Sequence, residues 1–156
     1  MDDVRSFILA YLESHHTITL ATCQENQPWA ATVFYASTDL TIYFFSDPKT
    51  RHAQNIAANP RVAATIQEDY HDWRKIKGLQ MEGEVLPVAS VFEKARAMTA
   101  YARKYPDVIK VFTNPQSGAL YKAFLKVRFY SFSPETIYYI DNERSFGKRE
   151  EYRVGH

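Results

Sequence analysis

The stretch WAATVFYASTDLTIYFFSDPKTRHAQNIAANPRVAATI, residues 29–66, decides the fold of this chain. It begins with β-branched and aromatic residues at 29–35 and repeats that composition at 41–45, with the polar turn Ser37-Thr38-Asp39 between them. Two such runs joined by a short polar loop predict an antiparallel hairpin. Ser46-Asp47-Pro48 then ends the second strand and begins a helix over 49–58, because Ser or Asp caps a helix and proline fits its first turn. Asn59-Pro60 closes that helix, and 61–66 is predicted to be the next strand.

The elements on both sides of this stretch predict the same mixed architecture. An amphipathic helix is expected over 4–14 and a strand over 17–23, and the stretch is followed by a strand over 76–85, a helix over 90–104 and a short helix from residue 107. The last predicted strands span 121–132 and 136–140, before a charged tail. Strands at short spacing, without strict alternation of strand and helix, indicate an α+β domain built around an antiparallel barrel or sandwich.

The composition bounds what such a domain can do. A chain of 156 residues is predicted to form a single domain over 1–156, and its 46% hydrophobic residues supply the core. The net charge of +1 gives no field that would attract nucleic acid or an anionic membrane, so neither is an expected partner. Aromatic residues make up 15% of the chain, which favours β-sheet, a surface that receives a flat ligand, or both.

Several familiar sites are missing from the sequence. The glycines form neither a dinucleotide fingerprint nor a P-loop, and there is no G-x-S-x-G nucleophile elbow. The histidines lack metal-ligand spacing and a single cysteine, Cys23, cannot form a zinc cluster, so no metal site is expected. The single cysteine also excludes a disulfide within the chain. The sequence contains neither a recognisable secretory leader nor a membrane-spanning run, which favours the cytoplasm. No catalytic residue is predicted.

One segment has the composition of an anion-binding site. Ser46-Asp47-Pro48-Lys49-Thr50-Arg51-His52 places hydroxyl groups, a guanidinium and an imidazole where an aromatic strand meets a helix N-terminus. Exposed backbone N–H groups and the helix dipole favour an anion there, and a guanidinium matches two phosphate oxygens. The aromatic residues directly before it suit a ligand with a phosphate at one end and a flat ring at the other. The same residues also fit an ordinary capped helix with solvated cations, and spacing alone does not choose between the two.

Residues across most of the chain, most densely 29–85, resemble a known family. The strands at 30–35 and 42–46, the helix start Lys49-Thr50-Arg51-His52 and the strand start Asn59-Pro60-Arg61-Val62-Ala63 are similar in order and content to the FMN-binding split barrel of the pyridoxamine 5'-phosphate oxidase superfamily. Three pieces resemble its YhbP-like branch more narrowly. They are residues 49–54, the motif Gly78-x-Gln80-x-x-Gly83-Glu84, and Phe146-Gly147-Lys148-Arg149.

The resemblance implies a mostly antiparallel, six-stranded split β-barrel with flanking helices, which forms a homodimer with FMN in a groove at the interface. It also implies the cofactor-binding residues. The isoalloxazine ring would lie along the strand residues Ala30, Ala31, Thr32, Val33, Phe34 and Tyr35. The ribityl chain would lie near Phe45 and Ser46, and the phosphate would be held by Thr50, Arg51 and His52 with the adjacent Lys49. Another strand would approach the flavin with Gly78 and Gln80. Lys148 could reach the flavin phosphate of a partner subunit.

The chain departs from the family pattern at three of these positions. Family oxidases commonly carry Arg where this chain has Ala30, Lys where it has Tyr35, and Lys where it has His52. The C-terminal Trp and Arg of the vitamin B6 oxidases have no clear match between Ser133 and Arg149. Pyridoxamine phosphate is therefore not the expected substrate.

The expected function is that of an FMN-dependent oxidoreductase acting on an unidentified small molecule, because the flavin carries the redox chemistry in this class. Two alternatives stay open. One is a non-catalytic split-barrel protein that holds haem or a flavin for sensing or storage, with His15, His16 and His71 as conceivable haem ligands. The other is a reductase that uses the deazaflavin F420 on the same scaffold.

Overall fold

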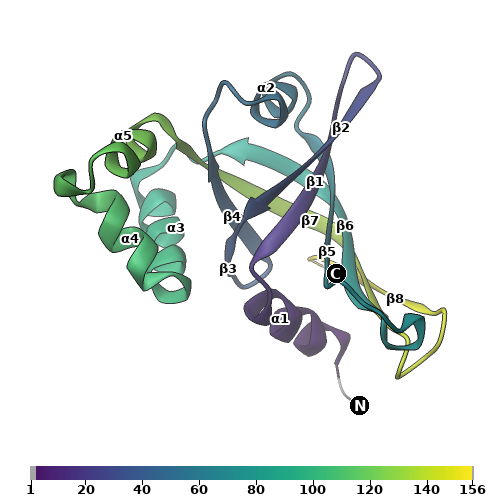
Figure 1. The fold of residues 1–156 in the computed structure, drawn as a ribbon. Coiled ribbons are helices and arrows are strands. Elements are labelled where there is room, and N and C mark those ends of the chain that lie inside the picture. Colours follow the sequence, from purple (N-terminus) through teal and green to yellow (C-terminus); the bar gives the residue numbers. More distant parts are fainter. Residues whose placement is uncertain (1–2, 156) are drawn as a thin grey trace.

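A single strongly curled antiparallel sheet dominates the computed structural model, which describes residues 3–155 (Figure 1). Eight strands form this sheet within those residues, in the order β2-β1-β5-β6-β7-β4-β3, with β8 paired to the second half of β7. The strands are β1 Thr17–Gln24, β2 Gln27–Phe34, β3 Ala36–Thr38, β4 Thr41–Ser46, β5 Arg61–Gln67, β6 Lys77–Pro87, β7 Arg128–Asp141 and β8 Arg149–Arg153. The helices are α1 Val4–Ser14, α2 Arg51–Ala58, α3 Val91–Lys104, α4 Pro106–Thr113 and α5 Ala119–Lys126, with short 3-10 helices at Trp73–Lys75 and Pro115–Ser117.

The chain itself joins the two ends of this sheet. β2 and β3 stand at opposite ends of the strand order, yet only Tyr35 separates them in sequence. The sheet therefore curls until its ends approach each other, which makes a barrel with a split beside β2. This arrangement confirms the predicted α+β class and the antiparallel, barrel-like sheet.

Alternating apolar side chains fill the inside of the curled sheet. The almost fully buried residues inside the sheet include Ile18, Leu20, Ile42, Phe44, Ile66, Leu79 and Phe132. Helix α1 adds Ile8 and Leu12 to the same cluster, because these residues lie on one face of the helix. A second, smaller cluster lies under α3, where Ala97 and Tyr101 are buried together with Tyr43 of β4.

The expected hairpin between residues 29–35 and 41–45 is only partly right. β2 pairs with β1 along its whole length, and β4 pairs with β7. The hairpin partner of β4 is the short β3, which follows the bend at Tyr35. The Tyr35 side chain is fully buried. This burial accompanies the bend that takes the chain from β2 at one end of the sheet to β3 at the other. The bend was not predicted, because the residues on both sides of Tyr35 are typical of strands.

The strand expected over 121–132 is wrong in its first half. Residues 119–126 form helix α5, and the strand begins only at Arg128. Tyr121, Phe124 and Leu125 recur at helical spacing, and Gly118 adopts a φ of +63° as the chain enters the helix. The aromatic composition favoured a strand here, whereas the spacing of the same residues was that of a helix.

β7 continues through Pro134, where two separate strands were expected. The pairing register with β6 shifts between Glu82 and Gly83, so a β-bulge accommodates the proline. The expected charged tail contains β8, which pairs with residues 136–140. The unpredicted strands β3 and β8 explain why the sheet has eight strands rather than six.

Helices α4 and α5 lie beside α3, outside the barrel (Figure 1). They contact each other through Phe112 and Phe124, whose rings stack with their centroids 5.3 Å apart. None of the residues of α4 or α5 is buried. Across residues 3–155, no helix combines the length and apolar character needed to cross a membrane.

Gly83 tests how tightly β6 packs on the bulge of β7. A Cβ atom at this position would lie 2.8 Å from the Cα of Pro134 and closer still to the carbonyl oxygen of Ser133, and both are backbone atoms. We expect Gly83→Ala to lower the free energy of unfolding by roughly 1–3 kcal/mol through overpacking. Urea denaturation measures this, with Glu84→Ala as the control because the Glu84 side chain is exposed. Equal midpoints for the two variants would contradict the prediction.

Candidate functional site

The outer face of the sheet carries two rows of small side chains. Residues paired directly across antiparallel strands share a face. One row consists of Thr32, Thr19 and Thr65 on β2, β1 and β5 and continues to Gln80 of β6, and the other consists of Ala30, Ala21 and Ala63. The three alanines and Gln80 are exposed. This part of the sheet therefore carries short side chains and is open in the single chain.

β2 has one backbone edge that no strand within residues 3–155 pairs with. Successive residues of an antiparallel strand direct their N–H and C=O groups to opposite edges. The Phe34 carbonyl accepts a hydrogen bond from Tyr101 Oη at 2.8 Å, and Tyr101 lies on the side of β2 away from β1. By alternation, the N–H and C=O groups of Ala30 and Thr32 point to the same open edge. A flat ligand with donors and acceptors on its rim could bind there.

Helix α2 begins a few residues after β4 ends, and Thr50 is its N-cap. The Thr50 Oγ1 accepts a hydrogen bond from Ala53 N and donates one to the Asp47 carbonyl at 2.8 Å. Asp47, which with Ser46 was the expected cap, instead accepts a bond from Lys49 N at 2.8 Å and shapes the preceding turn. The cap lies further along than predicted because Pro48 belongs to this turn and not to the helix.

Two cations gather beside the first turn of α2. An open hollow of about 480 Å³ lies there, which we call the α2 hollow, and its lining residues are Gln24, Glu25, Gln27, Lys49, Arg51, Gln54 and Asn55. The Arg51 guanidinium lies over the Trp29 ring, 4.2 Å from its centroid. The lining contains one carboxylate and two cations, and the remaining side chains are amides. Together with the positive end of the helix dipole, this arrangement favours an anion such as phosphate.

His52 is not part of the α2 hollow. Its Nε2 lies 2.8 Å from Ser46 Oγ and 3.3 Å from Thr50 Oγ1. Burial lowers the pKa of His52 below its ordinary value of 6.5, so the ring is neutral at neutral pH. The imidazole therefore orders two hydroxyl groups, and the positive charge of the site comes from Lys49 and Arg51.

Tyr35 and Phe45 do not lie with Ala30 and Thr32 on the outer face of β2, because Tyr35 is buried in the core and Phe45 packs against α3. The Tyr35 Oη donates to the Leu12 carbonyl at 2.8 Å, and its own carbonyl accepts a bond from Tyr105 Oη at 2.7 Å. The Phe45 ring packs against Tyr101, with centroids 4.8 Å apart. The structure thus groups Ala30 and Thr32 with the open edge, while Ala31 and Val33 are half-buried and Tyr35 belongs to the core.

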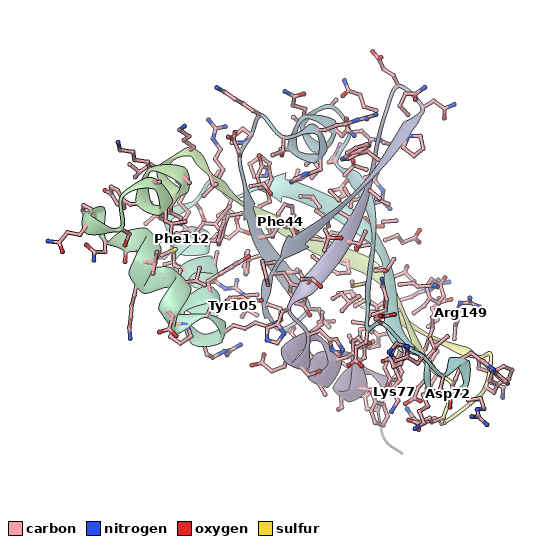
Figure 2. All side chains as sticks on the ribbon, viewed as in Figure 1. Phe44, Asp72, Lys77, Tyr105, Phe112 and Arg149 are labelled. Carbon is pink, nitrogen blue, oxygen red and sulfur yellow. The ribbon has the colours of Figure 1, made fainter. Side chains whose placement is uncertain are left out.

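The residues predicted from the distant motifs lie elsewhere on the sheet. Gly78 is buried in β6, and a Cβ there would lie 2.9 Å from the Ile66 carbonyl oxygen, so glycine allows close packing on β5. Gln80 is exposed on the outer face and accepts a bond from Arg149 Nε at 3.2 Å. Lys148 is in the turn before β8, and Figure 2 shows its neighbour Arg149 at the end of the sheet away from α2. Within one chain, Lys148 therefore does not join Arg51.

The sequence did not predict three side chains at the C-terminal end of α3 that bond to the end of β2, to Tyr35 or to the end of α1. Tyr101 and Tyr105 donate to the carbonyls of Phe34 and Tyr35. Lys104 Nζ lies 4.0 Å from the centroid of the Tyr35 ring and donates to carbonyls at the C-terminal end of α1. Burial lowers the pKa of Lys104 to about 8. The only signal in the sequence was that residues 101, 104 and 105 share one helical face.

The curled antiparallel sheet with a cationic hollow at the start of α2 agrees with the family that sequence comparison identifies. The chain belongs to the pyridoxamine 5'-phosphate oxidase family, whose model matches residues 5–141. It falls in the YhbP-like branch: it is 30% identical over 149 residues to the UPF0306 protein YhbP of Salmonella arizonae, covering 94% of this chain and 91% of that protein. It is 33% identical over 105 residues to a UPF0306 protein of Photorhabdus laumondii, covering 66% of this chain and 73% of that protein. The resemblance that the sequence indicated is confirmed.

Solved structures share the fold at low sequence identity. A heme binding protein from Mycobacterium smegmatis has a TM-score of 0.77 at 15% identity, covering 98% of this chain but only 59% of that longer chain. A putative pyridoxamine 5'-phosphate oxidase from Listeria innocua has a TM-score of 0.66 at 20% identity, covering 88% and 98%. An FAD-binding protein from Mesorhizobium loti has a TM-score of 0.63 at 22% identity, covering 83% and 88%. At these identities the likeness establishes the fold alone.

Thr50→Val tests the cap of α2. The valine retains the shape but loses the hydroxyl that accepts from Ala53 N, so we expect α2 to lose about 1 kcal/mol of stability. Chemical denaturation of the purified variant gives the change in the free energy of unfolding. Thr50→Ser restores the hydroxyl and should recover most of the loss. A valine variant as stable as the serine variant would show that the cap contributes little.

The neutral His52 ring predicts a loss of stability in mild acid. Its pKa is lowered on folding, so below about pH 6.5 the unfolded chain binds more protons at this site than the folded chain does. The contribution of the neutral His52 to the free energy of unfolding is therefore fully present above about pH 6.5. It is lost as the pH falls toward the lower pKa that His52 has in the folded state. Denaturation at several pH values should show a shallower acid decline for His52→Gln than for the unchanged protein. A variant His52→Gln with the same acid decline as the unchanged protein would contradict the prediction.

Proposed function

We propose that this protein is a homodimeric, FMN-dependent oxidoreductase that acts on a small molecule. The observation that carries the proposal is the α2 hollow beside the open edge of β2. FMN has a dianionic phosphate that matches the hollow and a flat ring whose polar rim matches the free backbone groups of Ala30 and Thr32. When bound, the flavin would supply transfer of a hydride or electrons. That the chain works as one domain in the cytoplasm stays a prediction from the sequence.

The residues of the α2 hollow divide the work of holding a phosphate. Arg51 is the strongest candidate, because a guanidinium donates two parallel hydrogen bonds and its stacking on Trp29 already restricts its orientation. Lys49 adds a second positive charge, and the amide of Gln54 adds a donor. Thr50 uses its hydroxyl proton on Asp47, so in the proposal it positions the helix and does not donate to the phosphate.

The outer face of β2, β1 and β5 is the proposed dimer interface. Its rows of alanine and threonine allow close approach of a second sheet, and the face lies next to the edge where the flavin would bind. A two-fold axis would place the same patch on both subunits. Gln80 and Lys148, which lie away from the α2 hollow of their own chain, would then approach the site of the second copy. Both residues would then contribute to a flavin site, as the family resemblance implies.

Haem binding is the second candidate, because a heme binding protein has the same fold. Of the conceivable ligands, His15 is the least suited. Its Nε2 lies 2.8 Å from Glu68 Oε1, and its Nδ1 lies 2.8 Å from the Tyr11 carbonyl oxygen, so both ring nitrogens have partners. His16 and His71 are exposed and carry this alternative. F420 is the third candidate ligand. The absorption spectrum of the purified protein separates a flavin from a haem, and titration with F420 tests the third case.

Arg51→Ala tests the phosphate assignment. Loss of one charge-assisted contact, worth about 1.5–3 kcal/mol, should weaken FMN binding tenfold or more. Riboflavin lacks the phosphate, so its affinity should change little, and flavin fluorescence titration measures both ligands. Arg74→Ala is the matched control, because Arg74 also lies over a tryptophan, 5.9 Å from the centroid of the Trp73 ring, but outside the α2 hollow. Equal FMN affinity in the two variants would reject the assignment.

Ala21→Arg tests the proposed interface. The exposed Ala21 lies on β1 in the middle of the alanine row, where a long charged side chain would hold the two sheets apart. We expect the dimer to dissociate and FMN affinity to fall with it, as measured by light scattering and by flavin titration. Ala123→Arg on exposed α5 is the control and should alter neither. A variant that stays dimeric would place the interface elsewhere.

A further inference from the structure

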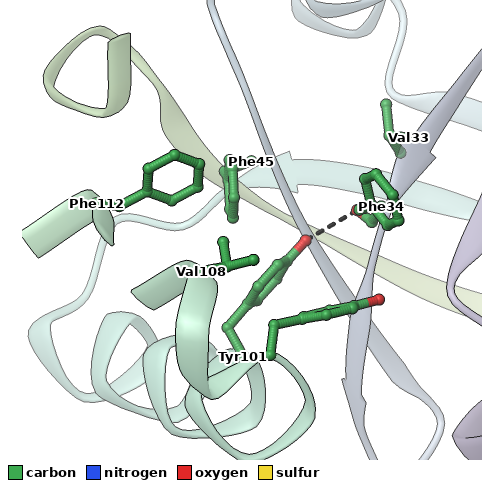
Figure 3. Close-up of a pocket in the computed structure, with 7 residues that line it drawn as sticks. Val33, Phe34, Phe45, Tyr101, Val108 and Phe112 are labelled. Atoms are coloured by element: carbon green, nitrogen blue, oxygen red, sulfur yellow. Dashed lines mark hydrogen bonds between the residues drawn. The ribbon is translucent and has the colours of Figure 1, made fainter. Parts of the chain in front are cut away.

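An apolar cavity of about 320 Å³ lies between the helices beside the barrel and the end of β2 (Figure 3). Its lining residues are Val33 and Phe34 of β2, Phe45 of β4, Tyr101 of α3, Tyr105 at the junction of α3 and α4, and Val108 and Phe112 of α4. All of these side chains are aliphatic or aromatic, and none is charged. The volume is at the lower end of the range found for small-molecule pockets.

The two tyrosines of the cavity have no hydroxyl proton to offer a ligand, because both protons are donated to backbone carbonyls. The Tyr101 Oη points to the Phe34 carbonyl, to which it donates at 2.8 Å (Figure 3). The Tyr105 Oη donates to the Tyr35 carbonyl at 2.7 Å. Burial raises the pKa of Tyr105 to about 12, as expected in apolar surroundings. Both tyrosines therefore contribute their rings to the walls.

The walls are built from aromatic rings arranged edge to face. The Phe45 and Phe112 rings are nearly perpendicular, with centroids 5.7 Å apart, and the Phe34 and Tyr105 rings are T-shaped at 6.0 Å. Phe34 is 62% exposed, and Val108 and Phe112 are only half-buried. A flat ring placed between them would cover apolar surface that the chain alone leaves open, and aromatic pairs favour this offset and edge-on geometry.

Two cations of α3 beside the cavity, Arg103 and Lys104, are already engaged. Lys104 lies over the Tyr35 ring, and its Nζ donates to the Leu12 and His15 carbonyls. Arg103 pairs with Glu13, with 3.6 Å between its guanidinium and the carboxylate. A ligand carboxylate or phosphate in the cavity would lose its hydration without gaining a charged partner among the lining residues, and burying such a group is costly. The site therefore selects against anions, in contrast to the α2 hollow.

We infer that this cavity is a binding site for an uncharged, planar aromatic molecule of one or two rings. Because Val33 and Phe34 also belong to the strand proposed to hold the flavin, the bound molecule would lie beside the cofactor and belongs to the substrate class. That substrate role rests on the proposed function, whereas the binding of the aromatic molecule does not.

A matched pair of probes tests the chemistry of the site. 2-Acetonaphthone and 2-naphthoate have nearly the same shape, but only the second is charged at pH 7. Titration calorimetry on the full-length protein should show one molecule of 2-acetonaphthone bound per chain, with at least tenfold weaker binding of 2-naphthoate. Equal affinity for the two probes, or binding of neither, would overturn the inference.

Val108→Trp tests the location. The larger ring would fill the cavity from α4, so 2-acetonaphthone affinity should fall tenfold or more while the melting temperature stays the same or rises. Val111→Trp, on the same helix but outside the lining, is the control and should bind normally. If the tryptophan variant does not fold, as judged by circular dichroism, Val108→Phe replaces it with the same expected loss. Unchanged affinity in the folded cavity variant would overturn the location.

FMN titration of the same proteins separates the two proposals. If the cavity is distinct from the cofactor site, Val108→Trp should leave FMN affinity unchanged, and saturating FMN should not expel 2-acetonaphthone. Competition between FMN and the probe would overturn the inference, because it would show that the flavin ring itself occupies the cavity. A protein that binds 2-acetonaphthone as described but rejects FMN would refute the proposed function and leave the aromatic site standing.

Discussion

The burial of Tyr35 is the constraint on which the rest of the structure depends. Its side chain lies at the corner between β2 and β3, its Oη donates to the Leu12 carbonyl, and Lys104 lies over its ring. Because β2 and β3 are the two ends of the sheet, this corner determines how tightly the sheet curls. It also connects the sheet to α1 and α3, so the closed end of the barrel and the position of α3 depend on the same side chain.

Both candidate sites follow from this corner. β2 turns into β3 instead of pairing with β4, so one edge of β2 has no strand partner within residues 3–155. The α2 hollow contains Gln27 at the start of β2, and the apolar cavity contains Val33 and Phe34 at its end. Val33 lies six positions after Gln27 along the strand, or about 20 Å. One strand thus has a cationic hollow at one end and an uncharged aromatic pocket at the other, which suits a cofactor with a phosphate and a ring beside a neutral substrate.

Much of the fold could be predicted wherever burial followed one simple period. β5 and β6 alternate between core and solvent, and α1 repeats its apolar residues at helical spacing, so all three elements were expected at nearly the right bounds. The cations Lys49 and Arg51 were also recognised, because a helix start after an aromatic strand is a local feature. The bend at Tyr35 and helix α5 were not predicted, since aromatic residues suit a strand, a corner and a helix face equally well.

The sequence by itself determined the order of most strands and helices, the family, and the positive charge at the start of α2, because each of these depends on neighbouring residues. Only the tertiary structure decided which strand stands at an open edge, that His52 bonds to Ser46 and leaves the charge to Arg51, and that Tyr101 and Tyr105 close a cavity over Phe34. These contacts join residues whose meeting depends on the curl of the whole sheet. Local periodicity records which face of an element is apolar, but it carries no information about the element that covers that face.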